Sequence, residues 1–388
     1  MLNTTETSTI ETSTIRIWDL PTRLFHWLLV FAFILAWLSQ GDDRYLDIHV
    51  FSGYLFLGLL LFRLIWGIIG SHYARFSHFA FGWAKVWQYL KTLFTQQHSR
   101  KPRIHFFGHN PAGSWAVFLI LGLSLIVSLT GLLTLGGEEQ HGLFAGMINF
   151  ALGNTFHWWH NIIAWLMLCF IGIHILGVLI ESRLHRENLV KAMITGFKAT
   201  STSFKASTHS FNVPRHGLIA AALLLTVIAG TLNYFKGYFQ QAQPYLPFIG
   251  PNLPDNASWR EACGECHLAY HPTLLPARSW QRMLTEQHDH FEEDLDLDEE
   301  TVTELHSFAI KNAAESMLTE AAWKINHSTP LEQSPLRMTK TSYWIEQHQN
   351  IDDKIWQHPD VNFQGNCGAC HLDAERGTFE DAAMHLPF

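Results

Sequence analysis

Five long apolar stretches dominate the first 236 residues of the chain. A helix that crosses a bilayer needs about 20 mainly apolar residues, and each of these stretches is close to that length. They lie at residues 24–40, 48–69, 114–135, 157–180 and 216–235. The pattern therefore predicts an all-α membrane protein with five transmembrane helices.

The charges between these stretches predict how the chain crosses the membrane. Loop 72–113 carries six Lys and Arg residues and no Asp or Glu, and segment 181–215 is also net basic. Segments 41–47 and 136–156 are acidic. Because basic loops stay in the cytoplasm, we expect the bacterial inner membrane, a cytoplasmic N-terminus and a periplasmic C-terminal part. Within the first basic loop, residues 78–94 have the spacing of an amphipathic surface helix.

Composition changes near residue 236 and divides the chain into a membrane part and a soluble part. Residues 1–236 carry 17 Lys and Arg against 10 Asp and Glu, whereas residues 237–388 carry 9 against 24. So acidic a domain argues against nucleic acid and suits a soluble partner with a basic docking face. We expect a disordered tail over residues 1–15 and a membrane bundle over 16–200. A linker with the fifth helix should follow over 201–236, and a mostly helical, loop-rich soluble domain over 237–388.

Four of the five cysteines form two copies of one motif in the soluble part. The first motif, CGECH, contains Cys263 and Cys266, and the second motif, CGACH, contains Cys367 and Cys370. A Cys-x-x-Cys pair followed directly by His is the attachment sequence of c-type haem. Two copies in one domain indicate two covalently attached c haems. Because bacteria attach such haem outside the cytoplasmic membrane, this motif and the loop charges agree on a periplasmic domain.

Histidines in the fourth apolar stretch indicate a second kind of haem site. His160 and His174 are 14 residues apart, so they project from roughly the same helix face and lie about 21 Å apart along the axis. Imidazole is costly in hydrocarbon unless it has a function. The spacing suits two haems stacked across the bilayer. By depth, we expect His49 to pair with His160 on the outer haem and His26 with His174 on the inner one.

Alternatives stay open at these positions. His157 shares a face with His160 and competes with it for the outer site, and any one of these histidines alone fits an interfacial residue that headgroups or carbonyls satisfy. Arg63 falls at the level of the inner haem, where its guanidinium suits a haem propionate or a quinone, or else it snorkels to the inner interface. His109, like the other histidines of the basic loops, is expected on the polar surface.

The first part of the chain resembles the bacterial cytochrome b561 family, which includes the di-haem cytochrome b subunits of nickel-iron hydrogenases. The resemblance lies in WDLPTRLFHW, IHVFSGYLFLGLLLFRLIWGIIGSHYARF, HWWHNIIAWLMLCFIGIHILGVLIES and ENLVKAMITGFK, over residues 16–198. It implies a four-helix bundle with two haem b groups that exchange electrons with quinone. The positions that match the family's haem ligands are His26, His49, His160 and His174. One departure is the HWWH sequence, where the family usually has an acidic residue near His160.

The second part resembles the small periplasmic dihaem cytochromes c. The resemblance lies in CGECHLAYHPTLLPARSWQRM, HDHF, RMTKTSYW and NCGACHLDAERGTFEDAAMHLP, over residues 258–388. It implies His267 and His371 as proximal iron ligands, with His290 and His348 as the favoured distal ligands. Other candidates for the distal positions are His271, His288, His306, His327, His358, His385, Met283, Met317, Met338 and Met384.

These features together predict an electron conduit with two haem b and two haem c groups. Quinol is oxidised in the membrane, and electrons pass to a soluble periplasmic cytochrome or another redox protein. The reverse direction is one alternative, and a second is a redox enzyme that oxidises superoxide or reduces a small molecule at an open haem. A haem-based sensor has little support because no signalling domain follows. A homodimer is compatible with the sequence.

Overall fold

The computed structural model describes residues 13–95, 106, 108–200, 213–239 and 250–386, and these form two compact units. The first unit contains the chain up to Ser39 together with Ile48–Ser128 and Asn161–Phe239. The second unit contains Gln40–Asp47, Leu129–His160 and the chain from residue 250 onward. Two long helices, over Pro111–Gly137 and Phe150–His185, contribute residues to both units.

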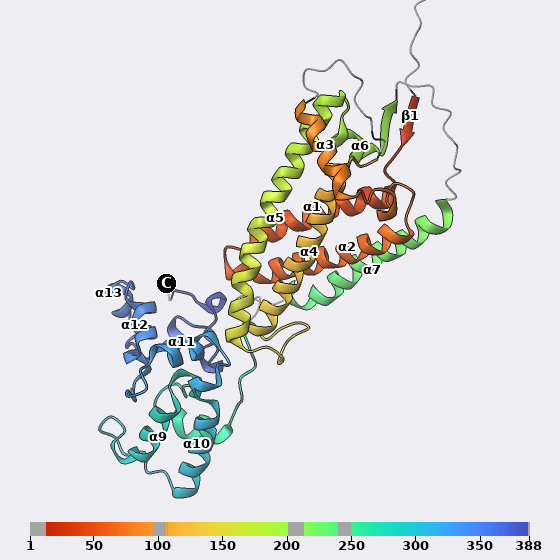
Figure 1. Ribbon diagram of the computed structural model, residues 1–388. Coiled ribbons are helices and arrows are strands. Elements are labelled where there is room, and N and C mark those ends of the chain that lie inside the picture. The colour runs from red at the N-terminus through yellow and green to blue at the C-terminus, as the bar shows by residue number, and fades with distance from the viewer. Residues whose placement is uncertain (1–12, 96–105, 107, 201–212, 240–249, 387–388) are drawn as a thin grey trace, which may run out of the picture. The chain divides into compact units, whose positions relative to one another are not determined.

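Five helices in the described residues are long and apolar enough to cross a membrane (Figure 1), which confirms the predicted all-α membrane fold. The fourth extends beyond the predicted stretch at both ends, since the helix continues where the hydropathy falls. These helices are α1 (Leu20–Ser39), α2 (Leu46–Ile69), α4 (Pro111–Gly137), α5 (Phe150–His185) and α7 (Val213–Phe239).

All five helices contribute to the core of the first unit. Its buried side chains include Phe25, Leu59, Leu123, Met167 and Leu224. Other apolar side chains point away from this core, and Leu38 and Ile68 are 76% and 73% exposed. Such outward apolar surface is expected where lipid replaces water around a helix bundle.

A small cap closes one end of the first unit. Strand β1 (Ser13–Arg16) pairs antiparallel with β2 (Phe197–Thr200), directly after helix α6 (Leu189–Thr195). Gly196 has a φ of +89°, and a Cβ there would lie 2.6 Å from the carbonyl oxygen of Trp18, so only glycine fits this connection. The predicted disordered tail is therefore wrong for residues 13–15, which pair in the strand; residues 1–12 of that tail and residues 201–212 of the predicted linker lie outside the described residues.

The first basic loop contains the short helix η2 (Phe76–His78) and helix α3 (Trp83–Thr95). Val86 and Tyr89 of α3 are buried, whereas Trp83 and Trp87 are exposed. The hydroxyl of Tyr89 donates a hydrogen bond to Glu181 near the end of α5, at 3.0 Å. These contacts hold the amphipathic helix against the end of the bundle.

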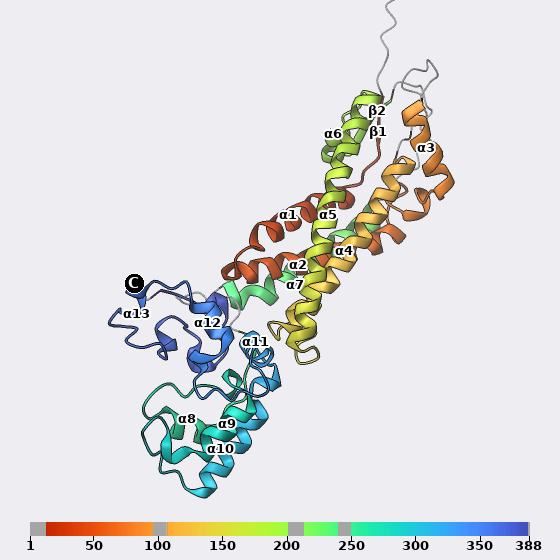
Figure 2. The ribbon, with the colours of Figure 1, turned by 60° about the vertical axis from the view of Figure 1, so that its left-hand side comes forward.

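Short helices joined by loops make up the soluble domain. In Figure 2, α8, α9 and α10 group at one end of this domain, and α11, α12 and α13 lie toward the other. The α-helices are α8 (Ala257–Gly264), α9 (Ala277–Thr285), α10 (Glu299–Asn312), α11 (Glu320–Ser328), α12 (Ser342–His348) and α13 (Asp353–Trp356). Its single-turn helices are η4 (Pro272–Leu274), η5 (Gln287–Asp289), η6 (Ala314–Ser316), η7 (Met338–Lys340), η8 (Cys367–Ala369), η9 (Ala374–Arg376) and η10 (Asp381–Ala383). A further single-turn helix, η1 (Asp43–Tyr45), lies between α1 and α2.

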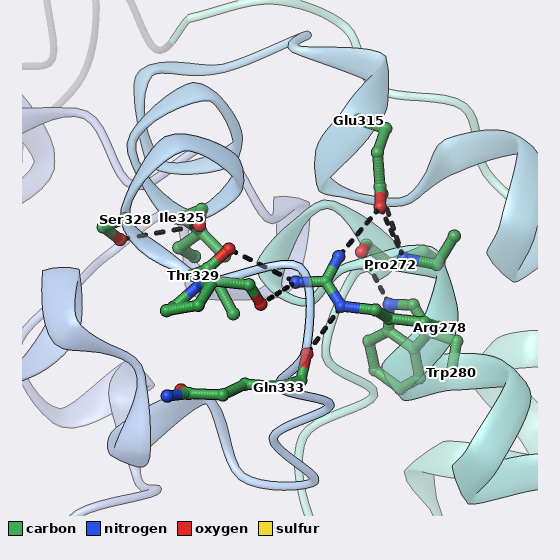
Figure 3. Close-up of polar contacts among 10 residues, drawn as sticks. Pro272, Arg278, Trp280, Glu315, Ile325, Ser328, Thr329 and Gln333 are labelled. Atoms are coloured by element: carbon green, nitrogen blue, oxygen red, sulfur yellow. Dashed lines mark hydrogen bonds and ion pairs between the residues drawn. The ribbon is translucent and has the colours of Figure 1, made fainter.

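Arg278 of α9 ties the two halves of this domain together (Figure 3). Its Nε donates to the carbonyl oxygen of Gln333 at 2.5 Å, and its Nη2 donates to that of Pro330 at 2.8 Å. Its Nη1 also lies 3.7 Å from a carboxylate oxygen of Glu315. Because residues 329–333 follow α11, this one guanidinium fixes the first half of the domain against the second.

Candidate functional site

The first motif of the soluble domain places an imidazole opposite a second imidazole from a later loop. His267 follows α8, and His290 follows η5. Their ring centroids are 6.3 Å apart, with 31° between the ring planes. A predicted proximal ligand and a predicted distal ligand therefore lie close together.

The second motif has the same arrangement. His348 is the last residue of α12, and His371 follows η8. Their ring centroids are also 6.3 Å apart, with 56° between the planes. The side chain of His348 stacks on Trp344 at 4.2 Å, which fixes the orientation of its ring.

Both spacings fit an iron atom held between two imidazoles. A metal–nitrogen bond to histidine is about 2 Å long, and a coordinating nitrogen lies about 1 Å from its ring centre, so two ligated rings should have centroids about 6 Å apart. The measured 6.3 Å agrees with this value in both pairs.

Backbone carbonyls orient one nitrogen in each pair. Nδ1 of His267 lies 2.8 Å from the carbonyl oxygen of Leu268, and Nδ1 of His348 lies 2.8 Å from that of Trp344. A hydrogen bond donated by Nδ1 leaves Nε2 free to coordinate a metal. A metal-ligating histidine usually donates its other ring N–H to a carbonyl or carboxylate in this way. In His371, Nδ1 is buried and has no hydrogen-bond partner among the described residues.

The motif thiols are suited to covalent attachment rather than to thiolate chemistry. Burial raises the pKa of the Cys263 thiol to about 12 and that of the Cys367 thiol to about 11. Redox-active Cys-x-x-Cys pairs need a lowered thiol pKa, so these residues do not have the character of a dithiol redox centre. All five cysteines are unpaired by disulfides.

Several of the other distal candidates already have structural hydrogen bonds. His271 uses both ring nitrogens, with Nε2 at 2.9 Å from the carbonyl oxygen of Pro254 and Nδ1 at 3.0 Å from Thr273 Oγ1. His288 forms an exposed ion pair with Asp294. Three further candidates have partners at Nδ1. His327 contacts the carbonyl oxygen of Trp323, His358 contacts the carboxylate of Asp360, and His385 contacts the carbonyl oxygen of Cys370.

In the first unit, His26 of α1 and His174 of α5 are close enough to interact electrostatically. Both side chains are half-buried, and Nδ1 of His26 is buried with no hydrogen-bond partner among the described residues. A buried imidazole nitrogen without a partner fits a prosthetic group at this site. The pairing of His26 with His174 on one haem stays a prediction.

Arg63 of α2 is buried in the same unit. It is 4% exposed, and its Nη2 donates to the carbonyl oxygen of Ala74 at 3.0 Å. Its guanidinium also lies 4.6 Å from the ring centre of Phe76. The other terminal nitrogen, Nη1, is buried without a hydrogen-bond partner among the described residues. A carboxylate such as a haem propionate would satisfy that nitrogen.

His109 was expected on the polar surface, and that expectation is wrong. Its ring packs between Trp18 and Phe79, with centroid distances of 4.8 and 4.3 Å, and its Nδ1 is buried without a hydrogen-bond partner among the described residues. Burial, and then the nearby charge of Arg63, lower its pKa to about 3. The sequence signal was available: His109 directly precedes Asn110-Pro111, where α4 begins, so it sits at the membrane edge.

The two predicted outer ligands belong to different units and are described separately. Nδ1 of His49 lies 2.9 Å from the carbonyl oxygen of Ala36. Nδ1 of His160 lies 3.3 Å from Thr130 Oγ1. A Cβ at Gly131 would lie only 3.0 Å from a carbon of that His160 ring, so the glycine makes room for the imidazole. The pairing of His49 with His160 stays a prediction.

His157, the rival at the outer site, has a different partner. Its Nδ1 lies 2.9 Å from a carboxylate oxygen of Glu138, and its side chain is 57% exposed. An exposed imidazole that already pairs with a carboxylate is a poorer haem ligand than the packed ring of His160. The geometry therefore favours His160.

Comparisons with known proteins match the two parts of the chain separately. Residues 17–196 match the model of the prokaryotic cytochrome b561 family, and residues 259–379 match that of the dihaem cytochrome c family. A probable Ni/Fe-hydrogenase 1 B-type cytochrome subunit of Escherichia coli (strain K12) is 24% identical over 212 residues, which cover 47% of this chain and 90% of that protein. A probable Ni/Fe-hydrogenase B-type cytochrome subunit of Azotobacter chroococcum mcd 1 is 25% identical over 213 residues, or 47% and 87% of the two chains. The solved dihaem cytochrome c from Rhodobacter sphaeroides is 31% identical, covers 33% of this chain and 100% of its own, and gives a TM-score of 0.30.

Proposed function

We propose a function for a chain that belongs to the prokaryotic cytochrome b561 family over residues 17–196 and to the dihaem cytochrome c family over residues 259–379. It is a membrane protein of haem electron transfer, and we infer that it oxidises quinol and delivers the electrons to a soluble periplasmic redox protein. Two b-type and two c-type haems supply the one-electron chemistry when bound. The polypeptide supplies the ligands, the burial and the order in which the sites are arranged.

The observation that carries this proposal is the pair of facing imidazoles at each c-type motif. Each pair has the 6.3 Å spacing that two ligands of one iron require. An iron with two histidine ligands has no open coordination position for a small molecule, so it is suited to electron transfer. This supports a conduit over the alternative of a redox enzyme with an open haem at its outer face.

In the membrane part, the same helix provides a ligand at two depths. His160 and His174 on α5 are separated by 14 residues, or about 21 Å along a straight helix. We assign His174 and His26 to the inner site and His160 and His49 to the outer site. Arg63, whose Nη1 is buried and unsatisfied among the described residues, is assigned to a propionate of the inner site.

A quinone site is proposed in the first unit, at the first basic loop and α4. An apolar cavity of about 280 Å³ is lined there by Ala80, Phe81, Gly82, Trp115 and Phe118. Phe118 stacks on Phe79, and Phe79 in turn packs against His109 with ring centroids 4.3 Å apart. We propose that the cavity holds the quinone ring or the start of its isoprenoid tail, and that the buried Nδ1 of His109 bonds a polar oxygen of the headgroup.

The balance of the reaction sets the kind of partner. Quinol releases two electrons and two protons on oxidation, whereas each haem site passes one electron at a time. The acceptor is therefore a one-electron redox protein. The acidic residues around the His290 loop are exposed, among them Glu292, Glu293, Asp294, Asp296 and Asp298. Opposite charge steers association, so a partner with a basic face is favoured.

A pyridine haemochrome assay on the purified full-length protein tests this proposal. The expected result is two b haems and two c haems per chain, with all four irons low-spin and six-coordinate by electron paramagnetic resonance. A quinol analogue should then reduce the c haems. A preparation without b haem would refute the bundle assignment, and a high-spin c haem that binds cyanide rapidly would favour the enzymatic alternative.

A further inference from the structure

The two c-type motifs lie in different surroundings within the second unit. We propose that the second motif (367–371) is the one that exchanges electrons with the membrane bundle, and that the first motif (263–267) is the one that exchanges electrons with the soluble partner. This inference rests on the proposed function and assigns an order to its last two sites. It is carried by contacts within the second unit, which contains both the soluble domain and the segments 40–47 and 129–160 that border the membrane helices.

The second motif is joined directly to a segment that packs against the membrane part. The amide of Leu372 donates to the carbonyl oxygen of Ala383 at 3.0 Å, and the amide of His385 donates to that of Cys370 at 2.8 Å. The same C-terminal segment includes η10, which packs against η1 in the short connection between α1 and α2. One stretch of chain therefore contacts both the second motif and the membrane part.

One further contact comes from the same side of the soluble domain. Phe150, the first residue of α5, has its ring centroid 5.8 Å from that of Trp323 on α11. Trp323 belongs to the half of the domain that carries His348 and His371, since α11 precedes and packs against α12. The half that contains the second motif therefore contacts both the connection between α1 and α2 and the start of α5.

The first motif has a solvent-exposed ligand loop instead. His290 begins a tight loop in which its amide donates to the carbonyl oxygen of Glu293 at 2.8 Å. Phe291, Glu292, Glu293 and Asp294 are all exposed, and Phe291 is 40% exposed although Arg337 lies over its ring at 4.1 Å. Within the second unit, this exposed loop offers a surface that a soluble redox protein can approach.

A buried side chain fixes the loop of His290 in place. The amide nitrogen of the Gln287 side chain donates to the carbonyl oxygen of Leu297, and its oxygen accepts from the Leu297 amide, both at 3.2 Å. The backbone carbonyl of Gln287 also accepts from the amide of Leu295 at 3.1 Å. The loop is therefore a preformed surface, which lowers the ordering cost of docking.

Tyr270 links the two motifs. Its ring lies 5.0 Å from that of His267, and its hydroxyl donates to the carbonyl oxygen of Gly365 at 2.5 Å. Gly365 also accepts from the amide of Cys367 at 2.9 Å. A single side chain therefore spans from a ligand of the first motif to the entrance of the second, so that one electron can pass between the two sites without a conformational change. No bond forms or breaks in this step.

Thiol cross-linking tests the contact itself, independently of electron transfer. Asp43→Cys with Asp381→Cys should be joined by a short bifunctional reagent in the intact protein, whereas the control pair Asp43→Cys with Asp294→Cys should not. The joined form should keep the haem spectrum of the wild type and reduce its c haems within threefold of the wild-type rate. Preferential joining of the control pair, or at least a tenfold loss of reduction in the joined Asp43–Asp381 form, would overturn the order.

Removal of one attachment site at a time tests the order of transfer. Cys263→Ala with Cys266→Ala should leave one c haem that a quinol analogue still reduces, because the proposed order places the first motif after the second. Cys367→Ala with Cys370→Ala should leave one c haem whose reduction is at least tenfold slower. Each variant is first checked by pyridine haemochrome for two b haems and one c haem. The reverse pattern, or equal rates, contradicts the order, whereas absence of quinol reduction in the wild type contradicts the proposed function instead.

Discussion

Replacement of Gly131 by Ala is the sharpest structural test of the outer b site. Gly131 lies in the interior of α4, and the added Cβ would be 3.0 Å from a carbon and 3.2 Å from Nδ1 of the His160 ring. Ordinary contacts between carbon atoms begin near 3.5 Å. The ring must therefore move by about 0.4 Å or more, since neither atom can be compressed by that amount.

This displacement is large for a metal ligand. Binding sites require their ligands to be held within about 0.5 Å of the productive geometry, and the shift also strains the contact between His160 and Thr130 Oγ1. Loss of an outer contact of a metal-ligating histidine typically costs about 10- to 100-fold in affinity. We expect Gly131→Ala to lower the content of haem b from two per chain toward one, as measured by pyridine haemochrome and by redox titration of the b-type absorbance.

Gly122→Ala is the matched control, because Gly122 lies in the same helix and a Cβ there would meet nothing within 4 Å. Alanine is the better helix former, so this variant should be neutral or slightly more stable. Both variants should retain two c haems, since neither glycine lies in the soluble domain. If Gly131→Ala binds two b haems with unchanged midpoint potentials, then His160 is not the outer ligand in the position described.

Three further predictions concern single side chains. His157→Gln should leave the content of all four haems unchanged in a haemochrome assay, because the His157 side chain is 57% exposed and water screens its ion pair with Glu138, which contributes about 1 kcal/mol or less; loss of one b haem would instead make His157 the ligand. Arg63→Leu should lower the midpoint potential of the inner b haem in a redox titration, by about 60 mV for each 1.4 kcal/mol of lost attraction, whereas an unchanged potential would remove Arg63 from that site. Burial and neighbouring carboxylates raise the pKa of both Glu139 and Glu380, so these groups hold protons in the folded chain above pH 4.3, where an unfolded glutamate is already ionised. Their contribution to stability is thus greatest in acid and is lost as the pH rises toward their raised pKa values. Glu380→Gln should therefore raise the melting temperature of the soluble domain by about 2–4 °C at pH 8 and have little effect at pH 5, and equal melting temperatures at pH 8 would contradict this reasoning.

The spans and the two c-type motifs of the soluble domain could be predicted from the sequence because both are encoded locally. A transmembrane helix is recognised by the hydropathy of its own residues, and each c-type motif contains its two thiols and one histidine within five residues. The facing partners His290 and His348 came from the resemblance to a family rather than from any local rule. Their meeting with His267 and His371 depends on how the loops fold.

Features that depend on packing between distant segments could not be predicted. His109 lies 91 residues from Trp18 in the chain, so its burial against that ring has no local signature beyond its place beside the start of α4. The pairing of β1 with β2 likewise brings residues 13–16 to residues 197–200. The contact of η1 with η10 brings together segments that are more than 300 residues apart in the chain. No pattern within either short segment predicts this contact.

The central claim is that electrons from quinol reach the c haems through the b sites of the membrane bundle. Single-turnover reduction of the purified full-length protein by a quinol analogue tests it most directly, with wild type compared with His174→Ala. The account predicts that the variant keeps both c haems, loses the inner b haem, and reduces its c haems at least tenfold more slowly than wild type. Reduction of the c haems at the wild-type rate in a variant that has lost the inner b haem would contradict it.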